Sequence, residues 1–142
     1  MTVARFFCLS SNHYLINNRM AKISKKTLVL GASLNSARYS YLAIERLRNF
    51  KHPVVGIGKR EGNVADVIID TDHPHIEDVD TITMYMNASN QKQYYDYILS
   101  LHPKRIIFNP GAENDELEQL AIKNGIKTLE ACTLVLLSTG QY

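Results

Sequence analysis

Residues 27–33 read Thr-Leu-Val-Leu-Gly-Ala-Ser, an apolar run that ends in three small residues. A short apolar run bounded by turn residues predicts a buried β-strand that leads into a tight turn. Apolar residues then recur at i, i+4 and i+7 between Ala43 and Phe50, which predicts a helix over residues 36–50. His52-Pro53 ends this helix, because the residue before a proline disfavours helical geometry.

The same alternation of strand and helix continues along the chain. Further strands are predicted over residues 53–58, 66–70, 81–86, 105–108 and 126–130, and further helices around residues 94–101 and 117–121. Apolar strands separated by amphipathic helices predict a parallel sheet with helices on both faces. The third and fourth strands are joined by a polar, helix-poor link. We therefore predict an α/β, three-layer Rossmann-like fold with a parallel sheet of about five to six strands, in the order 3-2-1-4-5-6.

Length and composition limit the class of protein. The 142 residues predict one domain that needs no disulfides, and 45% hydrophobic with 21% charged residues excludes a disordered or collagen-like chain. No apolar run approaches the roughly 20 residues of a membrane span. Two cysteines, Cys8 and Cys132, fit a reducing compartment better than a disulfide framework. We therefore expect a cytoplasmic protein without a membrane partner.

The net charge of +2 is unevenly distributed along the chain. Residues 1–24 hold three of the 16 basic residues and no acid, which leaves 13 bases and 14 acids in residues 25–142. Without a basic stripe, nucleic acid is not an expected partner. We interpret residues 1–24 as a dispensable N-terminal extension or a misassigned start, with a targeting peptide as the alternative, and residues 25–142 as the folded domain.

The predicted fold places a ligand at the carboxyl ends of the strands, where the strand order reverses. Residues 31–38, 87–90 and 109–114 meet there, and all three segments are rich in small or amide residues. The helix after the first loop has no acid before Glu45, so its N-terminal N–H groups are unopposed and suit an anion. Acids open the helix after Gly111 and would repel a phosphate. Phosphates are therefore expected at the first loop, and a purely structural turn is the alternative.

The kind of phosphate ligand is narrowed by residues that are missing. The first loop lacks the G-x-G-x-x-G pattern, and the second strand ends in Gly58-Lys59-Arg60 where an NAD site expects Asp or Glu. Two cations suit a ribose that carries its own phosphate, which leaves NADP or coenzyme A. The alternative reading of Lys59 and Arg60 is a solvated turn.

Four segments resemble a known family: residues 31–33, 38–40, 109–114 and 130–132. They are similar to those of the small stand-alone bacterial CoA-binding proteins, which resemble the CoA-binding domain of the succinyl-CoA synthetase alpha subunit. The resemblance covers residues 26–142 and implies a Rossmann-like domain that holds coenzyme A or acyl-CoA. It implies that Gly31, Ala32, Ser33 and Arg38 hold the diphosphate. The chain departs from the family at residues 35–37 and 58–59, where the family often has proline, and the second departure bears on the adenosine side.

The candidate binding residues are therefore Gly31, Ala32, Ser33, Arg38, Tyr39, Ser40, Lys59, Arg60, Asn87, Asn109, Pro110 and Gly111. No catalytic residue or metal ligand is assigned. The acids and histidines of residues 70–80 fit a solvated loop better than a zinc or calcium site. Cys132 is interpreted as structural rather than reactive, and the tyrosines of residues 94–97 as core, with ligand stacking as the alternative.

The leading hypothesis is a non-catalytic module that binds coenzyme A or acyl-CoA. The alternatives are an NADP-dependent reductase, for which few residues remain to build a substrate pocket, and a partner-dependent acyl-CoA ligase component. A ligase component would need a phosphorylatable histidine, and none of the five histidines lies in a recognisable phospho-loop. A third hypothesis, an interaction protein, predicts no small-molecule binding. A homodimer is compatible with these readings, although no residue pattern argues for one.

Overall fold

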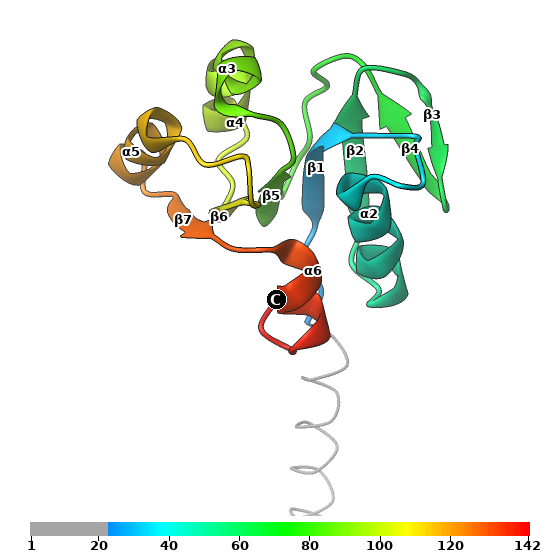
Figure 1. Cartoon of the computed structure of the whole chain (residues 1–142). Helices are drawn as coiled ribbons and strands as arrows, with labels where there is room; N and C mark the ends of the chain where they lie inside the picture. The colour runs from blue at the N-terminus through cyan, green and yellow to red at the C-terminus, as the bar shows by residue number, and fades with distance from the viewer. Residues whose placement is uncertain (1–22) are drawn as a thin grey trace, which may run out of the picture.

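Seven strands form one sheet in the computed structural model, which describes residues 23–142 (Figure 1). The predictions for the N-terminal extension therefore lie almost wholly outside the described residues. The strands are β1 (Thr27–Ala32), β2 (Val54–Gly58), β3 (Gly62–Val64), β4 (Val67–Asp70), β5 (Thr81–Met84), β6 (Arg105–Phe108) and β7 (Lys127–Glu130). The helices are α2 (Tyr39–Asn49), α3 (Ala88–Gln91), the 3-10 turn η1 (Lys92–Tyr94), α4 (Tyr95–Ser100), α5 (Asp115–Lys123) and α6 (Thr133–Ser138).

The sheet order is β3-β4-β2-β1-β5-β6-β7. All pairs are parallel except β3 with β4, and the six parallel strands have the predicted order. The α/β, Rossmann-like fold is therefore confirmed. The strand order reverses between β1 and β5, which is the expected place for a ligand.

The predicted strand count was wrong by one edge strand. Residues 62–64, between the predicted strands 53–58 and 66–70, form the additional strand β3, which is antiparallel to β4 and has Asn63 opposite Ile68. Glycine and asparagine disfavour strands locally, so β3 exists because the neighbouring β4 supplies a hydrogen-bonding partner.

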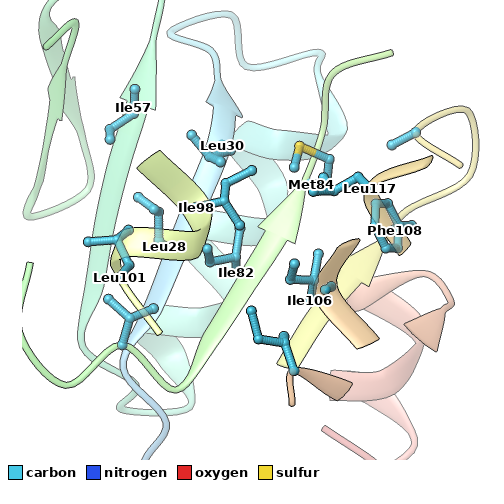
Figure 2. Packing of buried hydrophobic residues seen from close by; sticks show 14 of the residues in the cluster. Leu28, Leu30, Ile57, Ile82, Met84, Ile98, Leu101, Ile106, Phe108 and Leu117 are labelled. Atoms are coloured by element: carbon cyan, nitrogen blue, oxygen red, sulfur yellow. The ribbon is translucent and has the colours of Figure 1, made fainter. Parts of the chain in front are cut away.

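Alternate residues of the central strand point to opposite faces of the sheet. Leu28 and Leu30 pack against Ile98 of α4 and Leu117 of α5, whereas Val29 packs against α2 and α6 on the other face. Figure 2 shows the first of these clusters, with Leu28, Leu30, Ile57, Ile82, Met84, Ile98, Leu101, Ile106, Phe108 and Leu117 labelled. Two helical layers therefore cover the sheet, as the apolar strands predicted.

Three helices differ from the sequence prediction, and one of them is the four-residue α3, which was not predicted. Helix α2 begins at Tyr39 and not at Ser36, because the Asn35 side chain accepts the Ala37 N–H at 2.9 Å and holds the preceding residues in a turn. Helix α6 was not predicted, because its six residues, TLVLLS, are too few to display a helical period. It is stabilised by packing Leu137 against the α2 face of the sheet.

Candidate functional site

A cavity of about 760 Å³ lies at the carboxyl ends of the central strands. Its volume falls within the range of about 300–1,000 Å³ that is usual for small-molecule sites. The structure brings together at this cavity all but one of the predicted binding residues: Gly31, Ala32, Ser33, Arg38, Tyr39, Ser40, Lys59, Arg60, Asn87, Pro110 and Gly111.

Asn109 is the predicted residue that does not line the cavity. Its buried side chain donates to Thr83 Oγ1 at 2.7 Å and to the Met84 carbonyl at 2.9 Å, and accepts the Thr133 N–H at 2.8 Å. These bonds tie the end of β6 to β5 and to the start of α6. We therefore assign Asn109 a structural role in place of the direct ligand contact that the sequence suggested.

The first loop begins with a backbone geometry that favours glycine. Gly31 has φ +92°, and a Cβ there would lie 2.9 Å from the carbonyl carbon and oxygen of Tyr85. The register between β1 and β2 shifts between Leu30 and Ala32, which turns the chain out of the sheet. The absence of a side chain at Gly31 thus lets β1 and the end of β5 approach each other closely beneath the cavity.

The N-terminus of α2 faces this loop without a side-chain cap. Arg38 occupies the N-cap position, makes no side-chain capping bond, and no acid lies in the first turn. The N–H groups of residues 39–41 therefore have no partner within the helix. Free N–H groups and the positive end of the helix dipole together suit a phosphate.

The N-terminus of α5 already has hydrogen-bond acceptors and negative charges from its own residues, as the acids in the sequence predicted. Asn114 caps the helix by accepting the Leu117 N–H at 3.2 Å, and acids occupy the first turn. The Glu113 carboxylate accepts the Gly111 N–H at 2.9 and 3.0 Å, and this bond lowers the pKa of Glu113. An anion would meet negative charge here, so the two helix termini differ in what they can bind.

The charged residues that line the cavity in the described part of the chain are all basic. Arg38, Lys59 and Arg60 line it, and no carboxylate does so among the described residues. Lys59 and Arg60 follow β2, while Arg38 lies between β1 and α2. The positive charge is thus concentrated on the β1–β2 side of the cavity.

The opposite side of the cavity is neutral and contains residues that the sequence did not single out. Tyr85, Met86, Gln93 and Tyr94 line it, together with Asn90 and Ala112 from segments that the sequence had brought to the site. Among the remaining residues, the sequence pointed only to Tyr94, for which ligand stacking was the alternative to a role in the core. Tyr85 and Met86 follow the end of β5 and Gln93 lies in η1, and the direction of their side chains depends on tertiary packing.

A buried amide network joins the two loops on this neutral side. Gln91 donates to the carbonyls of Met86 and Ala112, each at 2.8 Å, and accepts from Asn114 at 2.8 Å. Asn114 also donates to the Tyr95 hydroxyl at 2.8 Å. The loop after β5 and the loop after β6 are therefore held at a fixed separation.

Two other groups singled out in the sequence lie elsewhere. Cys132 is half-buried at the start of α6 and does not line the cavity. Within residues 23–142, the acids and histidines of residues 70–80 are not gathered around a common point. Among the described residues, the one group of three whose ligand atoms all lie within 4.8 Å of one another is Asp115, Glu118 and Glu130, and acids of this kind do not by themselves indicate a metal.

The fold, with a basic cavity at the strand ends next to the uncapped N-terminus of α2, defines a small Rossmann-like domain of the nucleotide-binding class. A model of the CoA binding domain family matches residues 25–138. The chain therefore belongs to this family and is a CoA-binding module in this general sense.

Solved structures share the fold of this chain. A crystal structure of an uncharacterized protein is 50% identical to the chain, with a TM-score of 0.83, covering 85% of this chain and 100% of that one. A Thermus thermophilus protein (18% identity, TM-score 0.75, 90% and 98% covered) and a hypothetical protein from Pyrococcus horikoshii OT3 (15%, 0.75, 86% and 87%) share the fold. No curated protein matches the chain.

Proposed function

We propose that this protein binds coenzyme A or acyl-CoA as a single-domain module without chemistry of its own. The observation that carries the proposal is a cavity with three cations and no carboxylate, next to an uncapped helix N-terminus. Coenzyme A has a diphosphate and a ribose phosphate, so it complements this charge. Membership of the CoA binding domain family supports the same ligand.

Each part of coenzyme A has a matching part of the cavity. The diphosphate suits the loop that begins at Gly31, where the α2 N–H groups are free and Arg38 is close. The ribose phosphate suits Lys59 and Arg60, which follow the neighbouring strand β2. The uncharged pantetheine arm suits the neutral side beyond β5. A volume of about 760 Å³ is large enough for a ligand that extends across all three regions.

The lining residues support binding rather than catalysis. No His, Cys, Asp or Glu lines the cavity within the described part of the chain. General acid–base catalysis uses such groups with pKa values near neutrality. Burial raises the pKa of Tyr85, so the phenol of this residue stays protonated and supplies no base.

The test is calorimetric titration of the full chain after any co-purified ligand has been removed. Coenzyme A, dephospho-coenzyme A, NADP and NAD are compared. We expect coenzyme A to bind most tightly and dephospho-coenzyme A to bind less tightly, because only coenzyme A carries the ribose phosphate. A preference for NADP would refute the proposal in favour of a reductase, and no binding of any ligand would refute a small-molecule function.

Variants test the assignment of the cations. Arg38→Ala should weaken coenzyme A binding by about 1.5–3 kcal/mol, the range for a hydrogen bond to a charged group. Lys59→Ala combined with Arg60→Ala should remove the discrimination against dephospho-coenzyme A. Lys123→Ala, on exposed α5 outside the cavity, is the matched control for loss of a positive charge. Equal effects of Arg38→Ala and Lys123→Ala would exclude a direct role for Arg38.

The proposal includes a cytoplasmic location and a small-molecule partner, without nucleic acid or membrane partners. None of the helices in residues 23–142 has the length and apolar character needed to cross a bilayer. Cell fractionation tests the location, and recovery of the protein with the membrane fraction would contradict it.

A further inference from the structure

Three aromatic rings from two separate segments pack together next to the neutral side of the cavity. His73, in the loop between β4 and β5, lies with its ring centroid 4.7 Å from Tyr94 and 4.9 Å from Tyr97. The planes of His73 and Tyr97 are 23° apart, which is a stacked arrangement, and those of His73 and Tyr94 are 44° apart. Of these three rings, only Tyr94 lines the cavity.

The segment that carries His73 is held in place by a hydrogen bond. The Tyr97 hydroxyl donates to the Pro74 carbonyl at 2.6 Å, which fixes the backbone next to His73 against α4. Tyr97 itself packs against the buried core under the sheet. His73 therefore stands on a rigid support, although its own side chain is exposed.

The Tyr94 ring is packed on two sides and borders the cavity on a third. It packs on the core cluster and on His73, and it also borders the cavity. Aromatic pairs have preferred geometries, so the contact with His73 limits the orientations that the Tyr94 ring adopts. A wall that is held in place before the ligand arrives loses less conformational entropy on binding.

The position of Tyr94 in the sheet indicates which part of the ligand it meets. The cations that suit the ribose phosphate follow β2, and the diphosphate loop follows β1. Tyr94 follows β5, on the opposite side of β1 from β2. A ligand laid across the strand ends with its phosphates on the cations therefore brings its uncharged end to Tyr94.

We propose that His73 is a positioning residue that holds the Tyr94 ring as a preformed wall for the pantetheine arm of coenzyme A. This inference rests on the proposed function. It adds a pair of residues, His73 and Tyr94, that favours ligands with the uncharged pantetheine arm. His73 acts through Tyr94 and does not itself contact the ligand, since it lies outside the cavity lining.

The experiment compares two ligands on the full chain by calorimetry. Coenzyme A carries the arm, and adenosine 3′,5′-bisphosphate has the nucleotide without it. His73→Ala should weaken coenzyme A binding about two- to tenfold, the range expected from the energy of one aromatic pair, and leave adenosine 3′,5′-bisphosphate unchanged. His73→Phe should restore the affinity, because it keeps a ring at this position.

Two further variants separate positioning from general damage. His75→Ala, an exposed histidine of the same loop with no ring contact to Tyr94 in the described structure, is the matched control and should bind both ligands normally. In a Tyr94→Ala background, His73→Ala should have no additional effect on coenzyme A binding. This coupling would not appear if His73 only stabilised the fold.

The outcomes distinguish the inference from the proposed function. Normal coenzyme A binding by His73→Ala, equal weakening of both ligands, or effects that add to those of Tyr94→Ala would overturn the role of His73 and leave the proposed function intact. Failure of the unaltered protein to bind coenzyme A would overturn both. If His73→Ala lowers the melting temperature, the coenzyme A affinity of His73→Phe is compared with that of the unaltered protein. Equal affinities support the role of a ring at position 73, and a weaker affinity of His73→Phe overturns it.

Discussion

Gly31→Ala should destabilise the protein more than any other substitution of one glycine by alanine at a positive φ. The new Cβ would lie 2.9 Å from two backbone atoms of Tyr85, and backbone cannot move aside as a flexible side chain can. Backbone strain at φ +92° contributes about 1–3 kcal/mol. Overpacking contributes about 1–3 kcal/mol more. We expect a total loss of about 2–6 kcal/mol in the free energy of unfolding.

Gly111→Ala is the matched control, because it separates strain from collision. Gly111 has φ +91°, almost the same as Gly31, but a Cβ there would meet nothing within 4 Å. Only the strain of about 1–3 kcal/mol should remain. The difference between the two variants, about 1–3 kcal/mol, therefore measures the contact with Tyr85.

The assay is urea unfolding of the full chain, followed by circular dichroism and extrapolated to water. The slope of the free energy against urea should stay constant between the variants, which shows that the denatured state is unchanged. Equal losses for Gly31→Ala and Gly111→Ala would refute the reasoning, because the Tyr85 backbone would then move away from the new Cβ without a loss of stability. In calorimetry, Gly31→Ala should also weaken coenzyme A binding, since the loop that it distorts borders the cavity.

Two further predictions concern stability away from the phosphate loop. His52 accepts the Lys25 N–H through Nδ1 at 2.9 Å, and burial, followed by the charges of Lys25 and Arg105, lowers its pKa below the usual 6.5, while Asp80 opposes the shift. Because the pKa of His52 is lower in the folded state than in the unfolded state, neutral His52 contributes stability to the fold. This contribution is fully present above about pH 6.5 and is lost as the pH falls through the folded-state pKa. The melting temperature should therefore fall more between pH 7.5 and 5.5 in the unaltered protein than in His52→Asn, and identical falls would contradict the assignment. Gln91→Ala should lower the free energy of unfolding by about 2–4 kcal/mol, because it leaves buried partners unpaired. Gln93→Ala, at an exposed neighbouring position, should change it by less than about 0.5 kcal/mol in the same urea assay, and similar losses for both would contradict the role of Gln91.

Local patterns were sufficient for the architecture and for the charged half of the site. Continuous apolar runs and helical repeats depend on near neighbours in the chain, and the handedness of crossovers then allows few sheet orders. The uncapped start of α2 and the cations after β2 are likewise properties of short segments. For this reason the sequence predicted the six parallel strands, the side of the sheet that holds the cavity, and most of its lining residues.

Tertiary structure decided the features that depend on distant partners. Strand β3 forms only because β4 offers a ladder, and α6 only because the α2 face of the sheet accepts its apolar residues. Asn109 looked like a ligand residue, but the positions of Thr83 and Thr133 commit its side chain to the interior. His73 and Tyr94 are 21 residues apart, and their contact exists because the β4–β5 loop crosses behind η1. A side chain at a strand end takes its direction from what packs around it, and that packing is a property of the whole fold.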